Sequence, residues 1–370
     1  MPTPIRPNVL RMAPYSPGKP IDEVKRELGL SHVVKLASNE NPLGPSPKAV
    51  EAIQAAAQNL HLYPDAATFD LRAALSEHYG IGPEHLMVGN GSDELIHLLG
   101  LIYLSGPADA MVVGDPSFVR YDAAAYLSDS RLIKVALDAT YTHDLDAMAA
   151  AITPETRLVW IANPNNPTGT VITKTGFDRF LSRIPAHVTV VLDEAYYEYA
   201  EGLDDLPNSL DYVRAGAPVI GLRTFSKAYG LAGIRLGYGF ASAEIADAIH
   251  RAREPFNVNS LAQIGGIAAL RDREYLGESI AANTRGRAQI EAAFREVGAT
   301  PVPGYANFVL AEMGTEAKPI FEALLREGVI VRSGHVLGLP TTLRVSIGTE
   351  IENETFARAL VKVMGSKVTA

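Results

Sequence analysis

Short apolar runs recur through the middle of the chain and alternate with helical patterns. Seven runs predict strands, at 86–90, 110–115, 131–137, 157–163, 188–195, 218–225 and 235–241. Several are apolar at successive positions, which is typical of strands covered on both faces of a sheet. Between them, residues 92–104 carry a helical apolar stripe. Strands that alternate with helices predict an α/β fold with a mostly parallel sheet, which we assign to one large domain at 37–250.

The pattern changes after residue 250. Segments 260–272 and 275–298 predict long helices, and 352–365 predicts a closing helix. Strands are expected at 306–313, 329–334 and 343–348. We therefore expect a smaller α+β domain at 251–370. Prolines crowd the start, so residues 1–36 are expected to form an arm without regular structure that lies across the small domain or a site, together with part of the small domain.

Composition excludes several classes of function. The 370 residues carry a net charge of −9 and no cysteine. An acidic chain lacks the basic face that nucleic acid requires, and the missing thiols exclude disulfides and cysteine-ligated zinc. No apolar run approaches the ~20 residues that span a bilayer, and the start "MPTPIRPNVL" has no signal-peptide core. We therefore expect a cytoplasmic protein with no metal, no nucleic-acid partner and no membrane contact.

Common catalytic and nucleotide-binding motifs are missing too. The sequence contains no G-x-x-x-x-G-K-[ST], no H-E-x-x-H and no G-x-S-x-G. The stretch "VGNGSD" lacks the third glycine of a dinucleotide fingerprint, which argues against a dehydrogenase.

Three motifs in the large domain have both a chemical and an ordinary interpretation. In "VGNGSDELI" 88–96, a glycine turn leads into a helix whose free N–H groups could bind an anion, or Ser92 or Asp93 could simply cap that helix. The turn "NPNNPTGT" 163–170 could be a plain connection. In "VVLDEAYYEY" 190–199, Asp193 ends a buried strand, where open α/β sheets bind ligands, although a cap is also possible.

A fourth motif, "TFSKAYGLAGIRLGY" 224–238, places a lysine in a tight turn rich in glycine and alanine, where a long charged side chain packs poorly. Lys227 stands among small residues, with the hydroxyls of Thr224 and Ser226 before it and Arg235 after it. Burial or a neighbouring cation lowers the pKa of a lysine and makes it a nucleophile.

These four motifs, in this order, resemble the fold-type I aminotransferases that use pyridoxal 5'-phosphate (PLP), and within them the histidinol-phosphate aminotransferase family. Three further stretches carry the resemblance almost end to end: "APYSPGKPIDEVKRELGL" 13–30, "KLASNENPLGPSP" 35–47 and "LRVSIGTEIENETFARAL" 343–360. The resemblance implies a large domain with a mostly parallel seven-stranded sheet, a smaller α+β domain, PLP as cofactor and a homodimer.

The resemblance also implies roles for individual residues. Lys227 would join the cofactor as a Schiff base, and Asp193 would pair with the pyridine nitrogen. The phosphate would be held by Gly91, Ser92, Asp93, Thr224, Ser226 and Arg235. Tyr196 and Asn166 would face the phenolic oxygen, and Phe118 would stack on the ring. Tyr63 would reach into the site of the neighbouring subunit.

For the substrate, the resemblance implies that Arg344 binds the α-carboxylate, next to Asn166. Arg332 and Tyr15 match positions that hold the phosphate of histidinol phosphate. Three positions depart from the common pattern: Phe118 replaces a tyrosine, Arg120 is more charged than expected, and Leu43 replaces an aromatic residue.

The function that follows is transamination of L-histidinol phosphate with 2-oxoglutarate, giving imidazole-acetol phosphate and L-glutamate in histidine biosynthesis. Two alternatives share the fold: an aromatic amino-acid aminotransferase and a PLP decarboxylase of a phosphorylated amino acid. A transcription regulator with a PLP-binding domain would need a DNA-binding domain, for which the sequence has no room before "KLASNENP".

Overall fold

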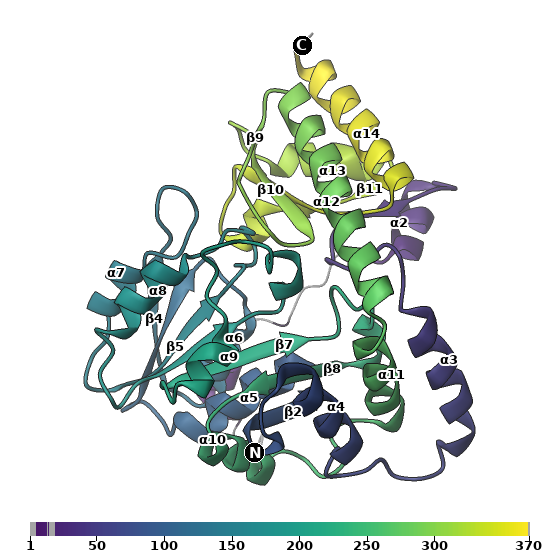
Figure 1. Ribbon diagram of the computed structural model, residues 1–370. Coiled ribbons are helices and arrows are strands. Elements are labelled where there is room, and N and C mark those ends of the chain that lie inside the picture. Colours follow the sequence, from purple (N-terminus) through teal and green to yellow (C-terminus); the bar gives the residue numbers. More distant parts are fainter. Residues whose placement is uncertain (1–4, 13, 15–18, 369–370) are drawn as a thin grey trace.

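The computed structural model describes residues 5–12, 14 and 19–368 (Figure 1). A large domain, built on a seven-stranded sheet, lies beneath a small domain built on a four-stranded sheet. Across the described residues, no helix is both long enough and apolar enough to cross a membrane.

The large sheet has the strand order β2-β8-β7-β6-β5-β3-β4. Its strands are β2 (Leu86–Asn90), β3 (Ala110–Asp115), β4 (Arg131–Ala136), β5 (Thr156–Ala162), β6 (Thr189–Asp193), β7 (Val219–Thr224) and β8 (Leu236–Phe240). Only β8 runs antiparallel to its neighbours, β2 and β7. The seven predicted strands and the mostly parallel sheet are therefore confirmed.

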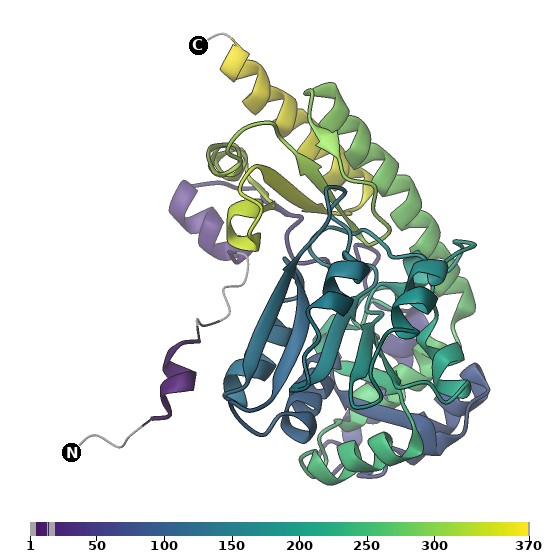
Figure 2. The ribbon, with the colours of Figure 1, turned by 90° about the vertical axis from the view of Figure 1, so that its left-hand side faces the viewer.

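Helices cover both faces of this sheet (Figure 2). One face packs against α5 (Ser92–Tyr103), α6 (Arg120–Leu127) and α10 (Ala243–Ala252), and the other against α7 (Leu145–Ala150), α8 (Lys174–Leu181) and α9 (Ser209–Arg214). Successive residues of β3 face opposite sides of the sheet. Met111 packs in the core under α5, α6 and α10, and Val112 packs in the core under α7 and α8. This double burial explains why the runs are apolar without alternation.

A third core lies where β2 and β8 meet α3 (Pro47–Ala56), α4 (Phe69–Tyr79) and α11 (Ser260–Leu270). Leu71 of α4 and Ala262 of α11 are buried in it, beside Leu236 of β8. Helix α11 thus packs with the large domain, although it follows residue 250. We propose that the domain boundary lies at the start of α12 (Arg273–Glu296) rather than at 250.

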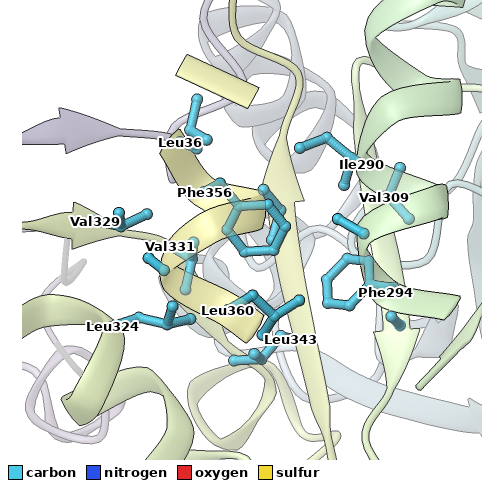
Figure 3. Close-up of a cluster of buried hydrophobic side chains, with 14 of the residues drawn as sticks. Leu36, Ile290, Phe294, Val309, Leu324, Val329, Val331, Leu343, Phe356 and Leu360 are labelled. Carbon is cyan, nitrogen blue, oxygen red and sulfur yellow. The ribbon is translucent and has the colours of Figure 1, made fainter. Parts of the chain in front are cut away.

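The small domain has a separate core (Figure 3). Its antiparallel sheet has the order β12-β13-β10-β9, with β9 (Thr300–Pro301), β10 (Phe308–Glu312), β12 (Arg332–Ser333) and β13 (Thr342–Ser346). Helices α12, α13 (Lys318–Arg326) and α14 (Glu350–Val368) pack on it. Phe294 of α12 and Phe356 of α14 meet with ring centroids 5.4 Å apart.

The segment predicted as one strand at 329–334 is divided between two sheets. Residues Val329–Ile330 form β11, which pairs in parallel with β1 (Val34–Lys35), whereas β12 pairs with β13. Helix α2 (Ile21–Leu28) joins this side of the small domain, because Val24 packs against Ile330.

The N-terminal arm is more regular than expected. Residues Pro7–Leu10 form a short helix, α1, and proline is compatible with its first position because the N–H there needs no helical partner. The Asn8 amide donates to the carbonyl of Tyr126 over 2.6 Å, so α1 lies against α6 of the large domain. The expectation of an arm without regular structure is wrong for these residues.

Helix α12 connects the two domains as one uninterrupted segment (Figure 1). Near its start, Ser279 accepts a hydrogen bond of 2.8 Å from Asn41, whose amide also donates to the carbonyl of Ala228 in the large domain. Towards its end, Ile290 and Phe294 enter the core of the small domain.

Candidate active site

A cavity of about 300 Å³ lies where the carboxyl ends of the central strands face the small domain. This is the edge at which open α/β sheets bind ligands. Most of the residues predicted for the site line it: Ser92, Asp93, Phe118, Asn166, Asp193, Tyr196, Thr224, Ser226, Lys227, Arg235, Arg332 and Arg344.

One end of the cavity is suited to an anion. Helix α5 begins at Ser92 and directs free backbone N–H groups at this end. Gly91 before it has φ 77°, and a Cβ there would come within 2.6 Å of the Arg235 guanidinium, so the position needs glycine. Arg235 forms a 3.2 Å ion pair with Asp93, and Thr224 at the end of β7 donates to Ser226 over 3.0 Å.

Lys227 lies in the wall of the cavity with its amine against a backbone carbonyl. Its Nζ donates to the carbonyl of Asn39 over 3.2 Å. Burial, followed by the charge of Arg344, lowers the pKa of Lys227 to about 8. The amine is therefore available in its neutral, nucleophilic form far more readily than an exposed lysine.

Asn39 connects the lysine to the rest of the site, a role that the sequence did not reveal. Its amide donates to the hydroxyl of Tyr196 over 3.1 Å, and its backbone N–H donates to Ser346 of β13 over 2.8 Å. Asn39 has φ 55°, which asparagine tolerates better than most residues. The only signal for this role was its place in "SNENP".

Asp193 is a buried carboxylate at the end of β6. Its Oδ2 accepts a 2.7 Å hydrogen bond from Tyr121, and Oδ1 accepts the backbone N–H of Ala195 over 3.2 Å. Burial raises the pKa of Asp193 to about 6, and the bond from Tyr121 acts in the opposite direction. A buried carboxylate in this position favours a cationic partner in the cavity.

Tyr121 was not predicted to be part of the site. It lies in the first turn of α6 and stacks on Trp160, with centroids 4.7 Å apart and planes inclined by 20°. Its ring also meets Phe118 edge to face over 5.7 Å. The only signal was its position three residues after Phe118, because its partner Asp193 is distant in the sequence.

Two arginines project from adjacent strands of the small domain. Arg344 on β13 donates to the side-chain oxygen of Asn166 over 2.6 Å and to the carbonyl of Ala37 over 3.0 Å. Arg332 on β12 is its directly paired cross-strand neighbour. Two guanidinium groups at one wall can bind an anion with paired hydrogen bonds.

The turn 163–170, which carries Asn166, is built by its own side chains. The Asn165 amide donates to Thr168 over 3.0 Å, and its oxygen accepts the hydroxyl of Ser117 over 2.8 Å. The backbone N–H of Asn165 donates to the carbonyl of Thr170 over 2.9 Å. The closely spaced asparagine and proline residues thus form a rigid turn that reaches the cavity.

Two of the predicted residues that the structure describes, Tyr63 and Gly91, do not line this cavity. Tyr63 is 82% exposed and stacks on Phe256 with centroids 4.7 Å apart. Gly91 lies beside the lining residues, and Tyr15 falls outside the described residues. Two of the positions that depart from the common pattern are also described by the structure. The Arg120 Nε lies 3.9 Å from the Asp93 Oδ1, and Leu43 is exposed.

The arrangement can hold a flat, phosphate-bearing aldehyde. An amine with a lowered pKa, a buried carboxylate and an anion cradle surround one space, and two further cations lie at its wall. Among the described residues, no group of His, Asp and Glu side chains could hold a metal ion.

Comparison with known proteins gives the same family throughout. The family model "Aminotransferase class I and II" matches residues 31–360. The chain is 50% identical to a histidinol-phosphate aminotransferase of Moorella thermoacetica, over 97% of this chain and 92% of the relative. It is 47% identical to histidinol-phosphate aminotransferase 2 of Pseudomonas aeruginosa, over 97% of each chain.

Solved structures agree. Histidinol-phosphate aminotransferase from Sinorhizobium meliloti, in complex with pyridoxal-5'-phosphate, superposes with a TM-score of 0.90 at 30% identity over 98% of both chains. Aspartate aminotransferase from Thermus thermophilus with maleate has a TM-score of 0.83 at 23% identity, over 98% of this chain and 99% of that one, and supports the fold alone. The chain belongs to the class I and II aminotransferases, and within them to the histidinol-phosphate aminotransferase family.

Proposed function

We propose that this protein transfers the amino group of L-histidinol phosphate to 2-oxoglutarate, giving imidazole-acetol phosphate and L-glutamate, with PLP as cofactor. The observation that carries the proposal is the cavity in which Lys227, Asp193 and the α5 terminus face the Arg332–Arg344 pair. The names of the most similar relatives support the same substrate.

The residues present fit PLP. The N-terminus of α5, with Thr224, Ser226 and Arg235, would hold its phosphate, and the missing Cβ of Gly91 leaves the space for this approach. Asp193 would pair with the pyridine nitrogen, and Phe118 would lie against the ring. Tyr196 and Asn166 would face its phenolic oxygen. When bound, PLP supplies an electron sink for the carbanion formed at the substrate Cα.

The chain's own groups supply the proton chemistry. Lys227 would anchor the cofactor through Nζ, and its lowered pKa favours that attachment near neutral pH. The same amine would act as the base and acid that moves a proton between the substrate Cα and C4′ of the cofactor. Asp193 would keep a proton on the ring nitrogen, because opposite charges in hydrogen-bond contact attract by roughly 5 kcal/mol at an effective dielectric near 20, before desolvation is subtracted.

The anionic group of the substrate selects the donor. Arg344 would bind a carboxylate, or in histidinol phosphate the phosphate that takes its place, and Asn166 orients its guanidinium. Arg332 and Tyr15 would add the further charge and hydroxyl that a phosphate dianion needs in a partly buried cavity.

The assembly belongs to the same proposal. Tyr63 is exposed in a single chain and stacked on Phe256, which suits a side chain that completes the site of a second copy. We therefore infer a homodimer with shared sites, acting in the cytoplasm.

A panel of amino donors tests the substrate. Purified holoenzyme is given 2-oxoglutarate with histidinol phosphate, phenylalanine, tyrosine or threonine phosphate, and glutamate formation is measured. Histidinol phosphate should have the highest kcat/KM. A preference for phenylalanine or tyrosine would assign the protein as an aromatic aminotransferase, and release of CO₂ from a phosphorylated amino acid would assign a decarboxylase.

A further inference from the structure

A hydrogen bond outside the cavity joins the two domains. Tyr141 lies in the loop between β4 and α7, and its hydroxyl donates to Oε2 of Glu312, the last residue of β10, over 3.0 Å. The same oxygen accepts the hydroxyl of Thr341 over 2.9 Å, and Oε1 accepts the backbone N–H of Gly314 over 3.1 Å. Glu312 is thus fixed within the small domain, and Tyr141 reaches it from the large domain.

The loop is built to hold Tyr141 in an unfavourable conformation. Tyr141 has φ 62°, a left-handed conformation that bulky residues rarely adopt. Asp138 closes the loop around it: its Oδ1 accepts the backbone N–H groups of Thr140 over 2.8 Å and Thr142 over 3.0 Å. A strained residue that its surroundings hold in place points to a positional role.

The other side of Tyr141 is bonded to the turn that carries Asn166. Its carbonyl accepts the hydroxyl of Thr170 over 2.8 Å. The hydroxyls of Thr170 and Thr168 lie 2.7 Å apart, and Thr168 accepts the amide of Asn165 over 3.0 Å. Tyr141 therefore links Glu312 to the turn next to Asn166.

These contacts close a ring through the candidate active site. In the β10–β13 ladder Glu312 pairs with Thr342, and two residues along Leu310 pairs with Arg344. Arg344 in turn donates to Asn166 over 2.6 Å. The ring therefore runs from Tyr141 through Glu312 and β13 to Arg344, and from Asn166 back through the turn to Tyr141.

We propose that Tyr141 is a positioning residue for the anion-binding arginine. Its hydroxyl holds the β10–β13 ladder against the 165–170 turn and so sets the place of the Arg344 guanidinium relative to Asn166. A guanidinium fork binds a carboxylate through two parallel hydrogen bonds, so a small displacement of the strand weakens that binding. The inference rests on the proposed function, in which Arg344 binds the anion of the substrate.

The first test separates binding from chemistry. Glutamate is mixed with holoenzyme in single turnover, and its dissociation constant and the maximal rate are measured. Tyr141→Phe keeps the ring and the strained backbone but loses the hydroxyl. We expect its glutamate dissociation constant to rise about three- to tenfold, the range for one lost hydrogen bond, with the maximal rate within about twofold. The proposal is overturned if the glutamate dissociation constant is unchanged, or if only the maximal rate falls.

Partner and control variants sharpen this test. Glu312→Ala removes this bond together with those from Thr341 and Gly314, so it should raise the dissociation constant at least as much as Tyr141→Phe. Adding Tyr141→Phe to Glu312→Ala should cause no further loss, because the bond between the two residues is already absent. Glu312→Gln keeps an acceptor and should remain near wild type. Tyr212→Phe is the matched control, since the Tyr212 hydroxyl donates to Asp178 over 2.5 Å entirely within the large domain. An equal effect of Tyr212→Phe would contradict a specific role for Tyr141.

A second readout needs no substrate. The chain has no cysteine, so Ser182→Cys at the end of α8 and Arg326→Cys at the end of α13 can carry spin labels on the two domains. The interdomain distance distribution should broaden with Tyr141→Phe and should stay as narrow as in wild type with Glu312→Gln. An unaltered distribution overturns the positioning role. Failure of the proposed function would differ, because it would appear in the wild-type holoenzyme as an absent or minor reaction with histidinol phosphate in the donor panel.

Discussion

Arg332 and Arg344 lie directly opposite each other on antiparallel strands at the wall of the cavity. Directly paired cross-strand residues have side chains close enough to interact, and like charges in this relation repel. The pair is therefore more favourable with an anion between the two guanidinium groups. A phosphate dianion, with two charges and three oxygens, satisfies both better than a carboxylate does.

The first prediction concerns this pair. Arg332→Ala should lower kcat/KM for histidinol phosphate. The fall should correspond to a loss of roughly 2–5 kcal/mol in transition-state stabilisation, the range for removing one partner of a buried charge pair. Phenylalanine and tyrosine as donors should lose less, because they have no phosphate. An equal loss for phosphorylated and unphosphorylated donors would mean that Arg332 supports the fold and not the substrate.

The second prediction concerns Lys227. Borohydride should fix PLP onto Lys227, and Lys227→Ala should lose transamination almost entirely, because it removes both the anchor and the proton carrier. The rate at which apoenzyme takes up PLP should rise with pH and level off above about 8, since burial lowers the pKa of Lys227 to about 8 and only the neutral amine attacks. Mass spectrometry that places reduced PLP on another lysine would refute the assignment.

The third prediction concerns Asp193 and its hydrogen-bond donor. Asp193→Ala should still bind PLP, but the chemical step should slow by orders of magnitude, because the protonated ring is lost. Tyr121→Phe should be milder: without the donated bond the pKa of Asp193 rises further, and the acidic limb of the rate profile should move to higher pH. A near-normal kcat for Asp193→Ala would show that another group holds the ring proton.

The sequence predicted the fold well because burial on both faces leaves a direct mark. Val112 and Met111 must both be apolar, since each faces its own layer of helices. The placement of α11 could not be predicted in the same way. This helix, at 260–270, is apolar on several sides, so its own sequence does not indicate whether it packs against β8 or against the small sheet.

The sequence predicted which residues line the cavity where they lie in short motifs, as at Lys227 and Asp193. Tyr121, Asn39 and Tyr141 were missed because each is tied to the site by hydrogen bonds to residues far away in the chain. Sequence spacing carries no record of such pairs. The division of 329–334 between two sheets was missed for a related reason, since the partners β1 and β13 lie at opposite ends of the sequence.

The fourth prediction concerns the dimer. If Tyr63 completes the site of the partner, Lys227→Ala and Tyr63→Ala chains should each have little transamination activity alone. Mixing them should restore activity, since one site of the heterodimer then has both residues. Subunit exchange is verified with differently tagged chains. Exchange without recovery would show that each chain completes its own site.

The fifth prediction concerns a buried carboxyl outside the cavity. Among the described residues, neither side-chain oxygen of Glu198 has a hydrogen-bond partner. Burial raises the pKa of Glu198 to about 7, against the opposing charge of Arg223. The folded state therefore binds this proton more tightly than the unfolded state, and the resulting stability is complete below about pH 4.5 and is lost as the pH rises through about 7.

Glu198→Gln removes this titration. The variant should gain stability relative to wild type between pH 5 and 8, by up to roughly 3 kcal/mol, since each pKa unit corresponds to about 1.4 kcal/mol. Urea unfolding at several pH values and one protein concentration measures the difference. Glu201→Gln, at an exposed position nearby, is the control and should follow wild type. A difference that does not change with pH would show that Glu198 is ionised throughout.

Helix α12 also determines how the small domain can move. Its 24 residues make a rod of about 36 Å, at 1.5 Å per residue. The rod starts against the large domain at Ser279 and Asn41 and ends in the core around Phe294. A tilt of about 5° at its base would therefore move its far end by roughly 3 Å, about the donor–acceptor distance of a hydrogen bond. Because Phe294 of α12 packs in one core with Leu343 and Val345 of β13, a change in the few contacts at the start of the helix would shift the strand that carries Arg344 relative to the cofactor pocket.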